Sequence, residues 1–493
     1  MRYILSIDQS TSSTKGYVWD ETGRKIAGAS IAHRQIINNL GWVEHDPVEI
    51  YKNVLLVSRL VLEKAQIPPE RVETIGLCNQ RETAVCWDAD TAEPLYNAIV
   101  WQCARAAEMV AELEKTGVAA AVRDKTGLPL SPYFTGAKLG WMIRNVEAAR
   151  GVIERGTLRA GTVDAWLCYK LTGRHCTDYS NASRTQLLNL DTLRWDADML
   201  ELFGLRNECM PELVMSDGEI GLTDMEGLLP KKVPIHSVLG DSHAALLAHR
   251  CTSVAMGKVT YGTGSSVMVN AGDSRPERSN GLATSLAWGV GGKVQYVLEG
   301  NINYTGSVIQ WLCDDIGLLK TPDEAGRLAA SVDSANGVYL IPAFSGLGAP
   351  WFSDSVRAAF LGMNRTTSRA HLARAAEECI AYQVTDVVEE IRRAMGEPLR
   401  QICADGGPTR DAFLMQFQAD MLGEPLYVSD MGECSAAGAA WCAAFAQGLC
   451  GEDAFLPSYR RLEPRMPQST RETYYTGWKS AVRTLLCCKG DCL

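Results

Sequence analysis

Four short segments of the chain combine small residues with hydroxyl or acidic side chains at places where turns are expected. They are 8–15 (DQSTSSTK), 262–266 (GTGSS), 304–307 (YTGS) and 405–408 (DGGP). Turns of this kind let backbone N–H groups and hydroxyls approach anionic oxygens closely. No Walker A sequence is present, and no G-x-G-x-x-G opens a helix after the first apolar segment. Each turn alone suits an ordinary hairpin, but together they favour phosphate binding without either common motif.

Two aspartates follow apolar segments at positions that suit phosphoryl transfer. Asp8 ends the segment YILSI, and Asp241 follows VLG, ahead of a helix expected at 244–248. Asp8 could hold Mg²⁺ through water beside the phosphates, or it could cap a turn. Asp241 could accept the proton of a substrate hydroxyl, or it could cap the helix. The pattern leaves both alternatives open for each residue.

Hydrogen-bonding side chains are concentrated at 79–83 (NQRET), between two apolar segments. Arg81 and Glu82 can fix a polyhydroxylated ligand through paired donors and acceptors, or they can be surface charges. Trp101 suits the C–H side of a sugar or polyol, and Tyr133 can place a hydroxyl at a pocket wall, although either ring could belong to the core. These residues predict a site for a small polyol or sugar.

The elements that would position these segments include two similar hairpins. The first spans 3–20, where Tyr3, Leu5 and Ile7 alternate with other residues and a polar turn is expected at 8–15. The second spans 257–270 around the GTGSS turn. Strand character returns at 74–87. Because the two hairpins resemble each other, we expect two related halves, with the boundary near residue 249.

Three helices stand out between and after the hairpins. One begins after Asp46-Pro47 and carries apolar residues at 50, 54, 57, 61 and 65. A longer stripe of period 3.6 runs from Leu372 to Ile391. The Ala-rich segment 436–448 predicts a tightly packed, buried helix.

Composition excludes several classes of protein. The chain has 493 residues, of which 46% are hydrophobic and 22% charged, and its net charge is −10. These values are typical of a globular protein and argue against a disordered chain or a general nucleic-acid binder. The longest apolar stretch, 436–446, is too short to span a membrane, and Asp8 interrupts the N-terminal apolar run too early for a signal peptide. We expect a cytoplasmic protein without membrane insertion.

The sixteen cysteines are scattered, and most stand alone in apolar contexts. We expect them to be small core residues in a reducing compartment. The tail CCKGDC, with Cys487, Cys488 and Cys492, lacks a paired C-x₂-C and a nearby histidine, so it is interpreted as a loose terminus. The seven histidines are too dispersed to suggest a zinc site.

Longer motifs occur in order along almost the whole chain. They are GWVEHDP (41–47), NQRET (79–83), AIVWQC (98–103), a segment at 133–145 with Lys138 and Trp141, NASRT (181–185), PAFSGLGAP (342–350) and FLMQFQ (413–418). By these motifs the sequence resembles the FGGY family of carbohydrate kinases, and within it the members that phosphorylate glycerol.

The resemblance implies an α/β fold with two actin-like (ribonuclease-H-like) ATPase domains around a deep cleft. The N-terminal domain, 1–248, would bind the polyol or sugar, and the C-terminal domain, 249–493, would bind mainly ATP. Closure of the cleft would exclude water as a competing acceptor. The resemblance also implies a homodimer or homotetramer.

The resemblance further implies in-line transfer of the γ-phosphoryl group of ATP to a primary hydroxyl. Asp241 would be the base, and Mg²⁺ would lie at Asp8 and Asp241. The residues placed on ATP are Thr11, Ser12, Lys15, Thr263, Gly264, Gly306, Gln310, Gly407 and Asp411. The residues placed on the polyol are Arg81, Glu82, Trp101, Tyr133, Asp241, Ser242 and Ser266.

Several positions depart from the family pattern. Ser10 replaces a glycine, and Lys15 replaces an arginine, which keeps the charge but loses the fork geometry. Asp411 replaces the asparagine that faces adenine, so the nucleotide preference could differ. Ser242 and Ser266 replace a glutamine and a phenylalanine that hold glycerol, which predicts a larger and more polar pocket.

The predicted activity is therefore an ATP-dependent kinase for a small polyol, with glycerol as the first choice and glycerol 3-phosphate as the product. The alternative among enzymes is a four- or five-carbon polyol or ketose, such as erythritol, erythrulose or xylulose. The alternative of another class is a polyol-binding sensor without turnover. Retention of Asp8, Asp241, Thr263 and Gly264 argues against the sensor, because a protein without turnover needs no base.

Overall fold

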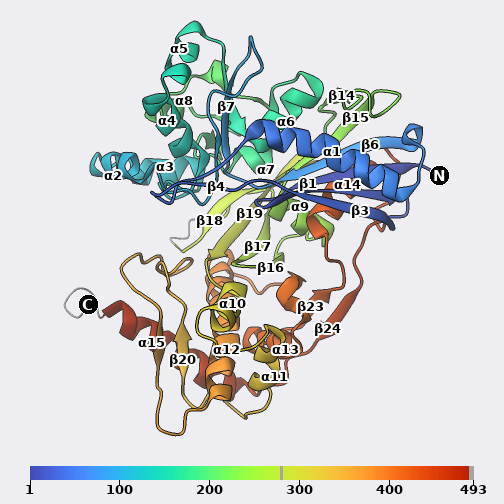
Figure 1. Cartoon of the computed structure of the whole chain (residues 1–493). Coiled ribbons are helices and arrows are strands. Elements are labelled where there is room, and N and C mark those ends of the chain that lie inside the picture. The colour runs from blue at the N-terminus through green and yellow to red at the C-terminus, as the bar shows by residue number, and fades with distance from the viewer. Residues whose placement is uncertain (278–280, 488–493) are drawn as a thin grey trace.

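The structure is a computed structural model that describes residues 1–277 and 281–487. It has two α/β domains, with the N-terminal half of the chain in the upper part of Figure 1 and most of the C-terminal half below it. Each domain is organised around one large sheet, and each sheet has its own apolar core.

The sheet of the first domain has six strands, and its centre is the predicted first hairpin. Strands β1 and β2 pair antiparallel, and β1 also pairs parallel with β6, which in turn pairs parallel with β15. In spatial order the strands are β14 (Gly221–Thr223), β15 (Val233–Gly240), β6 (Val72–Asn79), β1 (Tyr3–Gln9), β2 (Ser13–Asp20) and β3 (Lys25–Ala32).

The sheet of the second domain repeats this arrangement around the predicted second hairpin. Strands β16 and β17 pair antiparallel, β16 pairs parallel with β22, and β22 pairs parallel with β23. In spatial order the strands are β18 (Ala283–Val290), β19 (Lys293–Ile302), β17 (Ser265–Gly272), β16 (Met256–Tyr261), β22 (Gln401–Gly406), β23 (Leu426–Ser429) and β24 (Tyr459–Leu462). The shared pairing supports the expectation of two related halves.

A third sheet and several two-stranded pairs are added to this frame. The five-stranded sheet comprises β4 (Ile36–Ile37), β5 (Val43–His45), β8 (Ala98–Ile99), β7 (Ala84–Asp88) and β9 (Leu158–Thr162). The pairs are β10 (Cys176–Asp178) with β13 (Glu212–Val214), β11 (Leu188–Asn189) with β12 (Arg194–Trp195), and β20 (Tyr339–Ile341) with β21 (Ala359–Leu361).

Both domains also contain helices, which alternate with the strands along the chain. Those of the first domain are α1 (Pro47–Ala65), α2 (Ala107–Lys115), α3 (Ala119–Thr126), α4 (Thr135–Asn145), α5 (Glu147–Arg155), α6 (Val163–Thr172), α7 (Tyr179–Ala182), α8 (Ala197–Leu202) and α9 (Asp241–Ala248). Those that follow are α10 (Gly306–Asp314), α11 (Asp323–Ala329), α12 (Arg369–Met395), α13 (Ala412–Leu422), α14 (Cys434–Ala446) and α15 (Gln468–Cys487).

Helix α1 forms where the sequence predicts it. The Asp46 carboxylate accepts a hydrogen bond from the Val48 N–H at 2.8 Å, and Pro47 occupies the first turn, where its missing N–H costs nothing. The apolar stripe packs on β2 and β3. The predicted stripe at 372–391 likewise lies within α12, whose buried face joins the core of the second domain.

Helices α9 and α14 pack against each other between the two large sheets (Figure 1). Glycines allow this close approach: a Cβ on Gly438 of α14 would lie 1.9 Å from the Ala244 carbonyl oxygen, and one on Gly76 of β6 would lie 2.3 Å from that of Ala439. The predicted buried Ala-rich helix is thus confirmed. Because α9 begins with Asp241, this tight packing fixes the start of that helix.

Two expectations need correction or comment. The polar turn predicted at 8–15 is wrong in extent, because β1 continues to Gln9 and β2 begins at Ser13. Strand pairing therefore places Asp8 directly opposite Lys15 in the sheet. The strand character predicted at 74–87 is divided between β6 and β7, and the NQRET segment bridges them.

The cysteines among the described residues are free, and most are buried, as expected. Cys487 is exposed at the end of α15, while Cys488 and Cys492 lie outside the described residues. Among the described helices, none has both the length and the apolar character required to cross a membrane.

Candidate active site

The first predicted phosphate turn lies at the end of β1. Asp8 is 7% exposed, and one of its oxygens accepts a hydrogen bond from the Ser10 hydroxyl at 3.0 Å. The other oxygen lies 3.5 Å from the Lys15 ammonium. Thr11 and Ser12 form the tip of the turn, and the Ser12 side chain is exposed. The serine that replaces the usual glycine therefore bonds to the predicted metal-linked acid.

The second and third turns meet at the start of α10. The Gly306 N–H donates to the Gly262 carbonyl at 3.0 Å, and the Thr305 N–H donates to the Thr263 carbonyl at 3.0 Å. A Cβ on Gly264 would lie 2.4 Å from the Ile302 carbonyl oxygen, so only glycine fits there. Thr263 is exposed at the tip. Its carbonyl is engaged by the start of α10, whereas its exposed hydroxyl can face an anion.

Asp241 is the first residue of α9, directly after β15. Its Oδ1 lies 3.3 Å from Arg81 Nε and accepts a hydrogen bond from the Ser242 N–H at 2.6 Å. Burial raises the pKa of the Asp241 carboxyl, Arg81 opposes the rise, and the Asp8 carboxylate adds to it. The side chain is still 34% exposed, so a ligand can reach it. A carboxylate whose pKa is raised is a better base for a hydroxyl proton.

The NQRET segment is buried rather than exposed, which excludes its interpretation as surface charge. Arg81 is 7% exposed and Glu82 is 2% exposed. Glu82 also has a positive φ of 61°, which is strained for a residue other than glycine. Such strain persists only where the surrounding contacts hold it in place.

Those contacts come from two charged residues whose roles the sequence did not reveal. Arg81 donates two hydrogen bonds, each 3.0 Å long, to Glu299 of β19. Arg184 pairs with Glu82 at 2.6 Å and with Glu299 at 2.9 Å. Although burial opposes ionisation, the Arg184 and Arg81 guanidinium groups hold the pKa of Glu299 well below its usual range. Four buried charges thus join the two domains beneath Asp241.

An aromatic wall lies beside this charged network. The rings of Trp101 and Tyr133 pack edge-on, with centroids 5.6 Å apart. Trp101 Nε1 donates to the Thr11 hydroxyl at 2.9 Å, which links the first turn to this wall. Both rings are half-buried. Lys138 donates to the Pro132 carbonyl at 3.0 Å and to that of Tyr133, and burial lowers its pKa to about 7.

The two serines that depart from the family pattern flank Asp241 and Glu299. Ser266 of β17 donates its hydroxyl to Glu299 Oε1 at 3.3 Å. Ser242 follows Asp241 in α9, and both serines are half-buried. The two serines bring hydroxyl groups to this part of the site, and the larger pocket stays a prediction.

A large cavity lies farther into the second domain, between α10, α11, α12 and α13. Its volume is about 860 Å³, enough for a nucleoside. Three residues predicted to bind ATP line it, namely Gly306, Gly407 and Asp411. Gln310 is exposed on α10, where its amide bonds to Asp314, and it is not among the lining residues.

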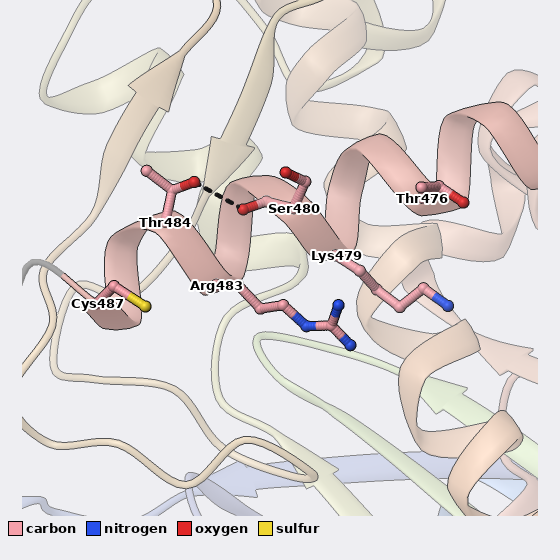
Figure 2. A pocket seen from close by; sticks show the side chains of 6 residues that line it. All are labelled: Thr476, Lys479, Ser480, Arg483, Thr484 and Cys487. Atoms are coloured by element: carbon pink, nitrogen blue, oxygen red, sulfur yellow. Dashed lines mark hydrogen bonds between the residues drawn. The ribbon is translucent and has the colours of Figure 1, made fainter.

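Two other features contribute none of the residues predicted to bind ATP or the polyol, although Asp405 of the first one begins the turn at 405–408. His249, Asp405 and Cys434 are buried close together, but His249 already bonds Asp405 at 2.6 Å and Tyr459 at 2.9 Å. Although burial opposes protonation, the hydrogen bond to Asp405 raises the pKa of His249 well above its usual value, which favours the protonated ring, and a protonated imidazole is a poor metal ligand. A hollow of about 700 Å³ lies along α15 (Figure 2), lined by Thr476, Lys479, Ser480, Arg483, Thr484 and Cys487.

Comparison with known proteins agrees with this arrangement. Residues 3–248 match the N-terminal domain of the FGGY family of carbohydrate kinases, and residues 257–447 match its C-terminal domain. The chain therefore belongs to the FGGY family. It is a phosphotransferase with an alcohol group as acceptor.

Individual relatives align along nearly the full chain. Glycerol kinase 1 of Thermotoga maritima is 45% identical over 490 residues, which cover 98% of this chain and 99% of that protein. Glycerol kinase of Caldanaerobacter subterraneus is 42% identical and covers 98% of both chains. The crystal structure of Plasmodium falciparum glycerol kinase with ADP has a TM-score of 0.93 at 32% identity, covering 99% of this chain and 98% of that one.

Proposed function

We propose that the protein transfers the γ-phosphoryl group of ATP to a primary hydroxyl of glycerol and produces glycerol 3-phosphate. The observation that carries the proposal is the position of Asp241. Its accessible carboxylate begins α9 and is held by Arg81, which also bonds Glu299 in the sheet of the second domain. The Asp8 carboxylate of the first phosphate turn is close enough to raise its pKa. The full-length similarity to glycerol kinases supports glycerol as the acceptor.

In this proposal the first domain, 1–248, holds the acceptor. Arg81 and Glu82 bond the hydroxyl groups, because both are buried at fixed positions and offer paired donors and acceptors. Trp101 and Tyr133 cover the carbon side of the ligand. Asp241 accepts the proton of the reacting hydroxyl as the new O–P bond forms.

The second domain, 249–493, holds most of the nucleotide. The phosphates lie between the turn at 8–15, with Thr11, Ser12 and Lys15, and the turn with Thr263 and Gly264. Gly306, Gln310, Gly407 and Asp411 lie toward the nucleoside. The cavity of about 860 Å³ beside three of these four residues supports this placement.

Asp8 and Asp241 fit a Mg²⁺ site. Both carboxylates are hard oxygen donors, and repulsion from Asp8 contributes to the raised pKa of Asp241. A divalent cation would relieve that repulsion. When bound, Mg²⁺ would supply charge neutralisation at the phosphate oxygens. In this proposal Arg81 and Glu82 keep the polyol aligned, and Arg81 holds the base Asp241 close to the reacting hydroxyl.

A second candidate acceptor is a four- or five-carbon polyol or ketose. Ser242 and Ser266 favour a longer acceptor, because both side chains are short. The Ser266 hydroxyl bonds Glu299, and no bulky side chain fills the space beside it. Glycerol alone would leave that part of the pocket to water. A polyol-binding sensor without turnover remains the candidate of another class. We also expect the protein to act in the cytoplasm as a homodimer or homotetramer, on the basis of the family resemblance.

An ADP-release assay with Mg-ATP distinguishes these candidates. The acceptors are glycerol, dihydroxyacetone, erythritol, erythrulose, xylitol, ribitol, xylulose and ribulose. The highest kcat/KM on glycerol supports the proposal, and the highest value on a longer acceptor supports the second candidate. Binding of a polyol without acceptor-dependent ADP release would support the sensor.

A further inference from the structure

A buried acid of α12 lines the cavity that we assign to the nucleoside. Glu377 is only 3% exposed, and its Oε2 has no hydrogen-bond partner among the described residues. Burying a carboxyl group without a partner is costly, so native proteins rarely do it without a function. The same cavity is lined by apolar residues, including Ile309, Ile380 and Leu414, and by charged ones such as Arg327 and Arg410.

The environment of Glu377 favours its protonated, neutral form. Burial raises the pKa of its carboxyl group well above the usual range, and the nearby Asp411 carboxylate acts in the same direction. A protonated carboxyl offers one O–H donor and one carbonyl acceptor side by side. It therefore presents the same hydrogen-bonding pattern as a glutamine amide.

Asp411 contributes a second oxygen to the same cavity. Its Oδ1 caps α13 by accepting a hydrogen bond from the Leu414 N–H at 2.9 Å. Its Oδ2 faces α11, where a Cβ on Gly326 would lie only 2.0 Å away. Glycine at 326 thus leaves room for this carboxylate. The second oxygen can only accept a hydrogen bond, whereas the asparagine amide expected from the family pattern can also donate.

We propose that Glu377 and Asp411 together recognise the adenine base and make the site selective for adenine over guanine nucleotides. Adenine carries an acceptor ring nitrogen beside its N6 amino donor, the pair that glutamine-like groups bind with two hydrogen bonds. Neutral Glu377 matches that pair, and Asp411 accepts from the amino group. Guanine has a carbonyl at the same place, which would face the Asp411 oxygen.

This inference rests on the proposed function only for the location of the nucleotide. It assigns Glu377 a role in specificity, not in the transfer step. The cost of an unpaired buried acid in the free protein is then offset when the base binds. Replacing Glu377 by leucine, which is apolar and of similar size, would remove both the cost of burying the acid and the recognition of the base.

Calorimetric titration of the full-length protein with Mg-ADP and with Mg-GDP, without acceptor, tests the inference. We expect the wild-type protein to bind ADP about 10-fold or more tightly than GDP. Glu377→Leu should weaken ADP binding about 10-fold and leave the melting temperature unchanged or higher. Glu377→Gln should retain ADP binding within about 2-fold, because it keeps the donor and acceptor.

A matched substitution on the same helix controls for general effects. Glu389 is 41% exposed and pairs with Arg392, so Glu389→Leu should leave ADP binding unchanged. Unchanged discrimination in Glu377→Leu, or equal losses in Glu377→Leu and Glu377→Gln, would overturn the inference. Absence of ADP binding by the wild-type protein would also overturn it.

The experiments distinguish failure of this inference from failure of the proposed function. If ADP binds with the expected selectivity but glycerol gives no ADP release, the acceptor assignment fails and the inference stands. If glycerol is phosphorylated and Glu377→Leu discriminates as the wild type does, the inference fails and the proposed function stands.

Discussion

The charge network beneath Asp241 predicts a large effect for Glu299→Gln. This substitution preserves shape but removes the negative charge that faces two buried guanidinium groups. Arg81 would lose its two 3.0 Å hydrogen bonds to a carboxylate, and Arg184 would lose the 2.9 Å pair. Only the carboxylates of Glu82 and Asp241 would then balance the positive charges of Arg184 and Arg81.

The magnitude follows from burial. The side chains of Glu299, Arg81 and Arg184 are 0%, 6% and 1% exposed, so solvent screens them little. Breaking a buried pair of this kind costs about 3–5 kcal/mol. Because Arg81 also positions Asp241, a displacement of about 1 Å would reduce kcat/KM for the polyol about 100-fold. The KM for ATP should change little.

Urea unfolding and steady-state kinetics measure the two effects. A suitable control is Glu112→Gln, because the Glu112–Arg144 pair is exposed on both sides and should contribute less than about 1 kcal/mol. The reasoning is refuted if Glu299→Gln is no less stable than Glu112→Gln and its kinetic constants for the polyol match those of the wild type.

Three further predictions address the base, the pocket and pH. Asp241→Asn should lower kcat by about 10²–10⁴-fold while the polyol still binds; turnover at the wild-type rate would show that Asp241 is not the base. Ser242→Gln combined with Ser266→Phe should raise kcat/KM on glycerol and lower it on longer acceptors, and the reverse result would reject the predicted pocket. Burial lowers the pKa of His45 to about 3, so its contribution to stability is present above about pH 6.5 and is lost as the pH falls below that value. The lowered pKa of Glu299 adds a loss below about pH 4.3. Urea midpoints between pH 8 and pH 3 check this. Because the pKa values of His33, His175 and His243 are also lowered by burial, His45→Gln should reduce, not abolish, the loss that begins near pH 6.5; an unchanged profile in that variant would contradict the assignment.

Local patterns predicted much of the fold because they depend on short-range chemistry. The Asp46 cap, the spacing of the α1 stripe and the small-residue turns each act within a few residues. The sequence predicts that the two hairpins resemble each other, but not which strands pair with them in the two sheets. The exact limits of β1 and β2 were missed because strand pairing, not local polarity, extends them.

The charged residues that the sequence did not reveal depend on contacts distant in the chain. Glu299 bonds Arg81 across 218 positions, and no local pattern contains that information. A signal was nevertheless present, since Glu299 interrupts the apolar strand segment YVLEGNI. Glu377 gave a similar signal, because it precedes Ile380 and Val384 by three and seven positions on the apolar stripe of α12. Charges placed among apolar positions of a helix or strand therefore deserve a search for distant partners.

The most direct test of the proposed function is identification of the product. The wild-type protein should convert glycerol and Mg-ATP into glycerol 3-phosphate and ADP in equal amounts, as followed by ³¹P NMR. Release of ADP together with inorganic phosphate, or no glycerol 3-phosphate at saturating glycerol, would contradict the account.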